Sequence, residues 1–282
     1  MNRPIIALIY DFDNTLSTHD MQEFTFIPAL GMSSTEFWAT CDKLSHERNM
    51  DHILAYMYLM ATKAREKGID LSRESLRKMG KDVEFFDGVE TWFKRINAYG
   101  KKLGFEVRHY IISCGLKSMI EGCPIGHEFY NVFACDYLYD DNGQILWPSV
   151  AINYTSKTQF LYRINKGVED VGEHKKLNMY MPQNNRVIPF ENMIYLGDGL
   201  TDVPSMKLTR TRGGYAIGVY RNPEDATYLV KEDRVDFYVQ CDYTEGSEMD
   251  VAMKAIFQKI SAKTRFKQLS ESSYNAARGK DD

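Results

Sequence analysis

The sequence begins with a short, uninterrupted run of apolar residues, IIALIY at 5–10. A run of this length without polar alternation is typical of a strand buried on both faces. Similar runs recur along the chain, and helical patterns lie between them. The further expected strands are 107–112, 193–196, 215–220 and 235–240, and the expected helices between them include 88–104, 157–166 and 201–211. This alternation predicts an α/β fold, in which helices cover both faces of a parallel sheet.

Residues 17–85, which follow the first expected strand, carry helix signals instead of strand patterns. Serines precede Glu36 in an arrangement that resembles a capping box. Asp51 and Ser72 are placed to cap two further helices, the first of which ends at Gly68. We therefore expect a separate helical domain inserted into the core. Its apolar stripe is interpreted as the core of the bundle, and a substrate-facing wall is the alternative.

Three other segments have distinct patterns. Residues 136–148 predict a β-hairpin whose two-residue turn is Asn142-Gly143. Residues 172–186 are polar and predict a surface insertion, and the last residues of the chain predict a frayed end. The expected division is a discontinuous α/β core over 1–16 and 86–270, a helical domain over 17–85 and a polar tail over 271–282.

Composition excludes several classes of protein. Hydrophobic residues make up 44% of the 282 residues, which is too many for a disordered chain. A net charge of −4 argues against a general nucleic-acid binder, because phosphate contacts need a basic surface. Neither a signal peptide nor a membrane-spanning run is apparent. The five cysteines form no CxxC pair, so we expect reduced thiols in a cytoplasmic protein.

Acidic residues follow two of the expected strands directly. Asp11 and Asp13 come after the first strand, and Asp198 and Asp202 follow the strand at 193–196. Ligands of open α/β sheets bind at the carboxyl ends of strands, and Mg²⁺ relieves repulsion between carboxylates there. The alternatives are solvated loop acids and, for Asp202, a helix cap.

Two further signals lie at similar positions. Ser113, followed by Cys114 and Gly115, ends the second expected strand, where a hydroxyl and backbone N–H groups could hold an anion. An ordinary turn is the alternative. Lys157 begins an expected helix and by itself predicts little, because most lysines are solvated. Carboxylates, a hydroxyl and an ammonium together predict Mg²⁺-assisted phosphoryl transfer.

With these four motifs, the sequence resembles the haloacid dehalogenase superfamily of phosphohydrolases. The resemblance rests on D-x-D-x-T at 11–15, the serine at 113, the lysine at 157 and G-D-x-x-x-D at 197–202, and covers roughly residues 4–245. It implies a Rossmann-like three-layer core with a parallel sheet and an inserted helical C1 cap. The hairpin and the motif spacing are most similar to the phosphoserine-phosphatase-like branch.

The resemblance also implies roles for individual residues. Asp11 would be the nucleophile that forms an aspartyl-phosphate, and Asp13 the general acid and base. Thr15 would orient the loop that carries both. Phosphate would be bound by the group Ser113, Cys114, Gly115 and Lys157. Mg²⁺ would be held by the group Asp11, Asp13 (through its backbone carbonyl), Asp198 and, in support, Asp202.

Substrate choice is less constrained. Asp20 stands where the resemblance places a substrate-recognising glutamate, and His19 and Glu23 are further candidates for contact with the leaving group. Arg48 and Arg65 could reach substrate from the helical domain, or could be solvated. We expect a phosphatase of a small phosphorylated metabolite. A phosphotransferase or phosphomutase is the alternative enzyme, and a non-catalytic protein that binds a phosphorylated ligand is the alternative outside enzymes.

Overall fold

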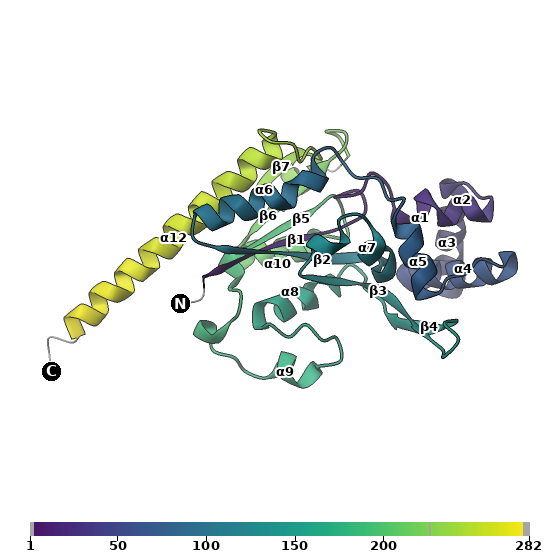
Figure 1. The fold of residues 1–282 in the computed structure, drawn as a ribbon, viewed down its shortest axis with the longest axis horizontal. Coiled ribbons are helices and arrows are strands. Elements are labelled where there is room, and N and C mark those ends of the chain that lie inside the picture. The colour runs from purple at the N-terminus through teal and green to yellow at the C-terminus, as the bar shows by residue number, and fades with distance from the viewer. Residues whose placement is uncertain (1–2, 226, 279–282) are drawn as a thin grey trace.

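The computed structural model describes residues 3–225 and 227–278. In this part of the chain, one seven-stranded sheet has the order β4-β3-β2-β1-β5-β6-β7 (Figure 1). The strands are β1 (Ile5–Tyr10), β2 (Glu106–Leu116), β3 (Asn131–Tyr139), β4 (Ile145–Val150), β5 (Met193–Gly197), β6 (Tyr215–Tyr220) and β7 (Phe237–Gln240). All neighbours pair in parallel except β3 and β4, which are antiparallel.

Strand β1 lies at the centre of the sheet, with β2 on one side and β5 on the other. Residues 6–10 of β1 are completely buried, which is why the strand has no polar alternation. The register of both pairings brings the ends of β1, β2 and β5 to one edge. The α/β fold expected from the sequence is therefore confirmed.

Helices cover both faces of the sheet (Figure 1). Helices α6 (Val89–Lys102) and α12 (Glu248–Arg278) lie together on one face, where Tyr99 packs on Phe257. Helices α8 (Lys157–Lys166) and α10 (Val203–Thr211) contact each other on the opposite face. The remaining helices of the core are α7 (Lys117–Gly122), α9 (His174–Asn178) and α11 (Thr227–Lys231), with short 3-10 turns at Gly126–Glu128, Gln183–Asn185 and Phe190–Asn192.

The helices that follow β1 lie beyond the carboxyl end of the sheet, and we call residues 17–85 the cap (Figure 1). Its helices are α1 (Met21–Phe24), α2 (Phe26–Leu30), α3 (Ser34–Arg48), α4 (His52–Lys67) and α5 (Arg73–Gly80). Ser33 and Glu36 form the expected capping box, and Asp51 and Ser72 cap α4 and α5 as predicted. The chain leaves and re-enters the core side by side, through a bridge between Ser17 and Phe85.

Three sequence expectations differ from the structure. The hairpin loop has five residues, 140–144, because the carboxylate of Asp140 accepts from the N–H groups of Asn142 and Gln144 and holds a wider turn. The polar insertion at 172–186 contains helix α9 and a 3-10 turn. The expected frayed end at 271–282 is helical up to Arg278, where α12 continues beyond its buried first half, and residues 279–282 lie outside the described residues.

Candidate active site

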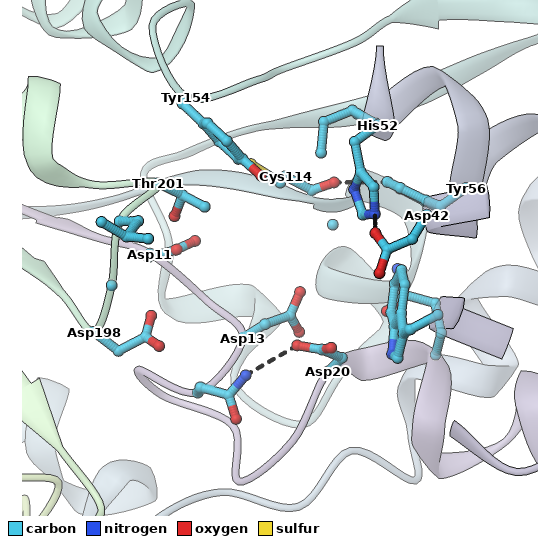
Figure 2. A pocket seen from close by; sticks show the side chains of 17 residues that line it. Asp11, Asp13, Asp20, Asp42, His52, Tyr56, Cys114, Tyr154, Asp198 and Thr201 are labelled. Atoms are coloured by element: carbon cyan, nitrogen blue, oxygen red, sulfur yellow. Dashed lines mark hydrogen bonds and ion pairs between the residues drawn. The ribbon is translucent and has the colours of Figure 1, made fainter. Parts of the chain in front are cut away.

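The ends of β1, β2 and β5 open onto a cavity of about 400 Å³ that the cap covers. Figure 2 shows the carboxylates of Asp13 and Asp20 near the centre of this pocket. Asp11 and Asp198 lie on the core side, and His52 lies on the cap side. The structure thus brings the predicted acidic motifs together at one edge of the sheet, which the parallel register requires.

Lys157 is the buried cation of this site. It is the first residue of α8, and its Nζ lies 2.7 Å from Oδ2 of Asp11 and 2.8 Å from Oδ1 of Asp202. Burial opposes the charged form, but the two carboxylates outweigh it and raise the pKa of Lys157 well above its usual value. Lys157 is therefore a fixed positive charge beside Asp11.

Asp202 is held by the core rather than by its own helix. It precedes α10, but its side chain makes no capping hydrogen bond, so the helix-cap alternative is wrong. The hydroxyl of Tyr195 instead donates to Oδ1 of Asp202 at 2.7 Å. A Cβ at Gly197 would lie 2.4 Å from the Asp202 carboxylate, so only glycine allows this approach.

Asp11 and Asp13 have different environments although they are two residues apart. Oδ1 of Asp11 accepts from the N–H of Phe12, and Oδ1 of Asp13 accepts from the N–H of Met21, both at 2.8 Å. Burial, followed by the charge of Asp202, raises the pKa of Asp11 to about 7. Burial and the charges of Asp20 and Asp11 raise the pKa of Asp13 well above its usual value.

The donor atoms fit a hard divalent cation. Carboxylate oxygens of Asp11, Asp198 and Asp202 lie within 4.8 Å of one another. Burial and the neighbouring charges of Asp202 and Asp11 raise the pKa of Asp198 well above its usual value. Lys157 alone does not balance this negative charge, and oxygen ligands suit Mg²⁺. The side chain of Asp13 lies outside this three-residue group.

The expected phosphate loop follows a different path from the one predicted. β2 continues to Leu116, so Ser113 lies inside an extended segment and not at its end. Ser113 is completely buried, and its Oγ accepts from the N–H of Gly115 at 2.9 Å. Cys114 and Gly115 line the pocket. Thr15 is buried near the loop, and its Oγ1 has no hydrogen-bond partner among the described residues.

The candidate leaving-group residues separate into two sets. Asp20 lines the pocket and accepts from Nδ2 of Asn14 at 2.9 Å. His19 is exposed and packs edge-on against Phe24, while Glu23 accepts from the indole N–H of Trp38. Neither His19 nor Glu23 lines the pocket, since both side chains are engaged with the cap.

Two cap helices also line the pocket, and of the residues involved Asp42, His52 and Tyr154 were not anticipated from the sequence. The cap residues share helical spacing: one pair is four residues apart on α3, and another is four residues apart on α4. These residues are Trp38 and Asp42 on α3 and His52 and Tyr56 on α4, joined by Tyr154 from the loop after β4. The four-residue spacing could have indicated a common face, but each residue alone resembles an ordinary helix residue.

Hydrogen bonds hold this cap face against the core. The Tyr56 hydroxyl donates to the Cys114 carbonyl at 2.6 Å, while within the cap Nε2 of His52 lies 3.0 Å from Oδ1 of Asp42 and links α4 to α3. Nδ2 of Asn153 donates to Asp51 at 3.0 Å. The cap therefore contacts the expected phosphate loop directly.

Comparison with known proteins agrees with this geometry. The family model for haloacid dehalogenase-like hydrolases matches residues 8–207. An uncharacterized protein of Borreliella burgdorferi is 29% identical over 273 residues, which cover 87% of this chain and 94% of that protein.

Solved structures show a similar fold at low sequence identity. A substrate-bound phosphoserine phosphatase complex is 16% identical with a TM-score of 0.53, over 84% of this chain and 93% of that one. Cytosolic 5′-nucleotidase IIIB bound to cytidine is 17% identical with a TM-score of 0.51, over 93% and 87%. Because the family model matches most of the chain, from β1 into α10, this protein belongs to the haloacid dehalogenase-like hydrolase family.

Proposed function

We propose that the protein is a Mg²⁺-dependent phosphatase that hydrolyses a phosphomonoester through an aspartyl-phosphate. The observation that carries this proposal is the position of Asp11, whose Oδ2 lies 2.7 Å from the Lys157 ammonium in a pocket that Asp13 also lines. Family membership as a hydrolase supports the same reaction class. A carboxylate nucleophile, an adjacent acid and a fixed cation are the groups that this reaction needs.

In the first step, an oxygen of Asp11 attacks phosphorus, and the bond between phosphorus and the substrate's alcohol oxygen breaks. Asp13 gives its proton to that alcohol oxygen, so that a neutral alcohol leaves. Burial and the charges of Asp20 and Asp11 raise the pKa of Asp13 well above its usual value, which favours the protonated form that this step needs. The hydrogen bond from the N–H of Met21 fixes the direction of the carboxyl group.

In the second step, Asp13 takes a proton from water, and the water oxygen attacks phosphorus. The bond between phosphorus and Asp11 then breaks, which returns the Asp11 carboxylate and releases phosphate. Lys157 stays charged throughout and offsets the negative charge that develops on the phosphoryl oxygens. Cys114 and Gly115 line the pocket, and Ser113 holds this segment in place by accepting from the Gly115 N–H at 2.9 Å.

Asp11, Asp198 and Asp202 would hold Mg²⁺, with the Asp13 backbone carbonyl as a further candidate ligand. When bound, the ion would neutralise carboxylate and phosphate charge. This leaves Asp202 with a double role, because it also pairs with Lys157 and Tyr195.

A chromogenic assay tests the proposal. We expect the purified protein to hydrolyse p-nitrophenyl phosphate in the presence of Mg²⁺, to lose this activity in EDTA and to regain it when Mg²⁺ is restored. A matched control is the exposed cap variant Asp82→Asn, which should behave as the wild type. Activity that is unchanged in EDTA would contradict the metal requirement, and transfer to added glycerol that exceeds transfer to water would favour a phosphotransferase.

A further inference from the structure

The cap half of the pocket has a composition that the phosphoryl chemistry does not require. It is lined by the carboxylates of Asp20 and Asp42 and by the aromatic side chains of Trp38, Tyr56 and Tyr154. Figure 2 shows Asp42, His52 and Tyr56 on the side of the pocket away from Asp11 and Asp198, so a leaving group that extends away from Asp11 would reach these side chains. The side chains in this half of the pocket therefore indicate which leaving group the pocket can accept.

The described pocket wall contains no lysine or arginine. Its one basic side chain is His52, whose Nε2 already lies 3.0 Å from Asp42. The two arginines that the sequence offered as substrate contacts are elsewhere: Arg48 is exposed outside the pocket, and Arg65 lines a separate cavity. A carboxylate on the leaving group would thus meet the carboxylates of Asp20 and Asp42 with no lysine or arginine of the pocket wall to pair with it, and like charges in proximity cost free energy.

A buried polar group at the same wall points to a ligand. Gln22 lines the pocket and is 2% exposed, and its Oε1 has no hydrogen-bond partner among the described residues. Buried amides are normally satisfied, because an unmade hydrogen bond costs about 1–3 kcal/mol. An N–H or O–H group of a bound molecule that reaches this amide would supply the missing donor.

The aromatic residues complete a surface that favours positive charge. Trp38 presents its ring beside His52, at 6.3 Å between centroids and 23° between planes, and its indole N–H is already used by Glu23. The hydroxyl of Tyr56 is likewise used by the Cys114 carbonyl. What these side chains offer a ligand is mainly their rings, and aromatic faces attract cations.

We propose that this half of the pocket binds the ammonium group of an amino alcohol that carries no carboxylate, so that the substrate class is the phosphate monoesters of such alcohols. This inference rests on the proposed phosphatase function. Asp20, Asp42 and Gln22 provide acceptors for the cation, and the rings provide its apolar surroundings. The reaction is the hydrolysis described above, with the amino alcohol as the leaving group.

Two substrates isolate the claim, because O-phosphoethanolamine and O-phosphoserine differ by one carboxylate. We expect kcat/KM for O-phosphoethanolamine to exceed that for O-phosphoserine by at least about tenfold, because both carry the ammonium group and only O-phosphoserine places a carboxylate beside Asp20 and Asp42. Asp42→Asn should reduce this ratio by about two- to fivefold, because the Asp42 side chain is 64% exposed and water screens its charge. Asp82→Asn, an exposed cap residue outside the pocket, should leave the ratio unchanged.

Each other outcome has a distinct meaning. The protein could hydrolyse p-nitrophenyl phosphate but cleave O-phosphoserine or cytidine monophosphate faster than O-phosphoethanolamine. That result would overturn the inference and leave the proposed function intact. A ratio that Asp42→Asn does not change would overturn the assignment of this pocket wall. Failure to hydrolyse any ester, p-nitrophenyl phosphate included, would contradict the proposed function and overturn the inference with it.

Discussion

Tyr10 and Asp11 are consecutive residues at the end of β1, and both are buried, yet they belong to two polar clusters of opposite character. The hydroxyl of Tyr10 accepts from the indole N–H of Trp92 at 2.9 Å and donates to Nδ1 of His109 at 3.0 Å. Nε2 of His109 lies 3.0 Å from Oδ1 of Asn97 and completes the chain. Each of these contacts is a hydrogen bond between a neutral donor and a neutral acceptor.

The cluster around Asp11 is not balanced in this way. Asp11, Asp13, Asp198 and Asp202 share one lysine, and the pKa values of the first three are raised mainly by burial. A satisfied neutral network stabilises a fold, whereas buried charge without a partner costs stability. The two clusters therefore act on stability in opposite directions. The neutral network stabilises the interior of the sheet, and the unfavourable buried charges lie beside the pocket at the ends of the strands.

The largest combined loss of activity and stability is expected from removing the cation of the acidic cluster. Lys157→Met leaves Asp11 and Asp202 buried without their ammonium partner. We expect activity to fall by about 10²–10³-fold or more and the free energy of unfolding to fall by about 3 kcal/mol. The measurements are p-nitrophenyl phosphate hydrolysis and urea denaturation. Wild-type activity in a folded variant would contradict the role of Lys157.

The neutral network should respond to pH in a characteristic way. Burial lowers the pKa of His109 from 6.5 to about 3, so the folded protein keeps His109 neutral where the unfolded chain protonates it. His109 therefore makes stability fall as pH drops from about 6.5 toward 3, by up to about 1.4 kcal/mol per pH unit. His109→Gln should reduce this slope in denaturation curves collected between pH 4 and 7. An unchanged slope would contradict this assignment.

A smaller effect is expected from changing Tyr10, which belongs to the neutral network and directly precedes Asp11 in the chain. Tyr10→Phe removes the hydroxyl that pairs with Trp92 and His109, so we expect a loss of about 1–3 kcal/mol in the free energy of unfolding. Because Tyr10 does not line the pocket, kcat/KM should change by less than about twofold. A large loss of activity with unchanged stability would show that the two clusters are not separate.

The same contrast explains how much could be predicted from sequence. Asp11, Asp13 and Asp198 were predictable because their position depends on local order: a buried strand, then acids at its end. The path of the Ser113 loop was not, because β2 extends past it through pairing with β3. Partners far apart in the chain, such as Tyr10 and Trp92, leave no local signal.

The cap shows the same limit. Its helices were predictable from capping residues such as Ser33, Asp51 and Ser72. The residues that it presents to the pocket depend on how α3 and α4 pack on the core, which no short segment encodes. His52 and Asp42 meet because α3 and α4 pack against each other within the cap.

Asp11→Asn, compared with the wild type at pH 7.5 in EDTA, tests the central claim most directly. Burial raises the pKa of Asp11 from 3.8 to about 7, so its ionised form costs stability: this cost is absent below about pH 3.8 and grows as pH rises toward 7. We predict that Asp11→Asn loses p-nitrophenyl phosphate hydrolysis by about four orders of magnitude or more, measured with Mg²⁺, yet unfolds at the same or a higher temperature than the wild type in EDTA. Retained activity, or a marked loss of thermal stability, would contradict the account.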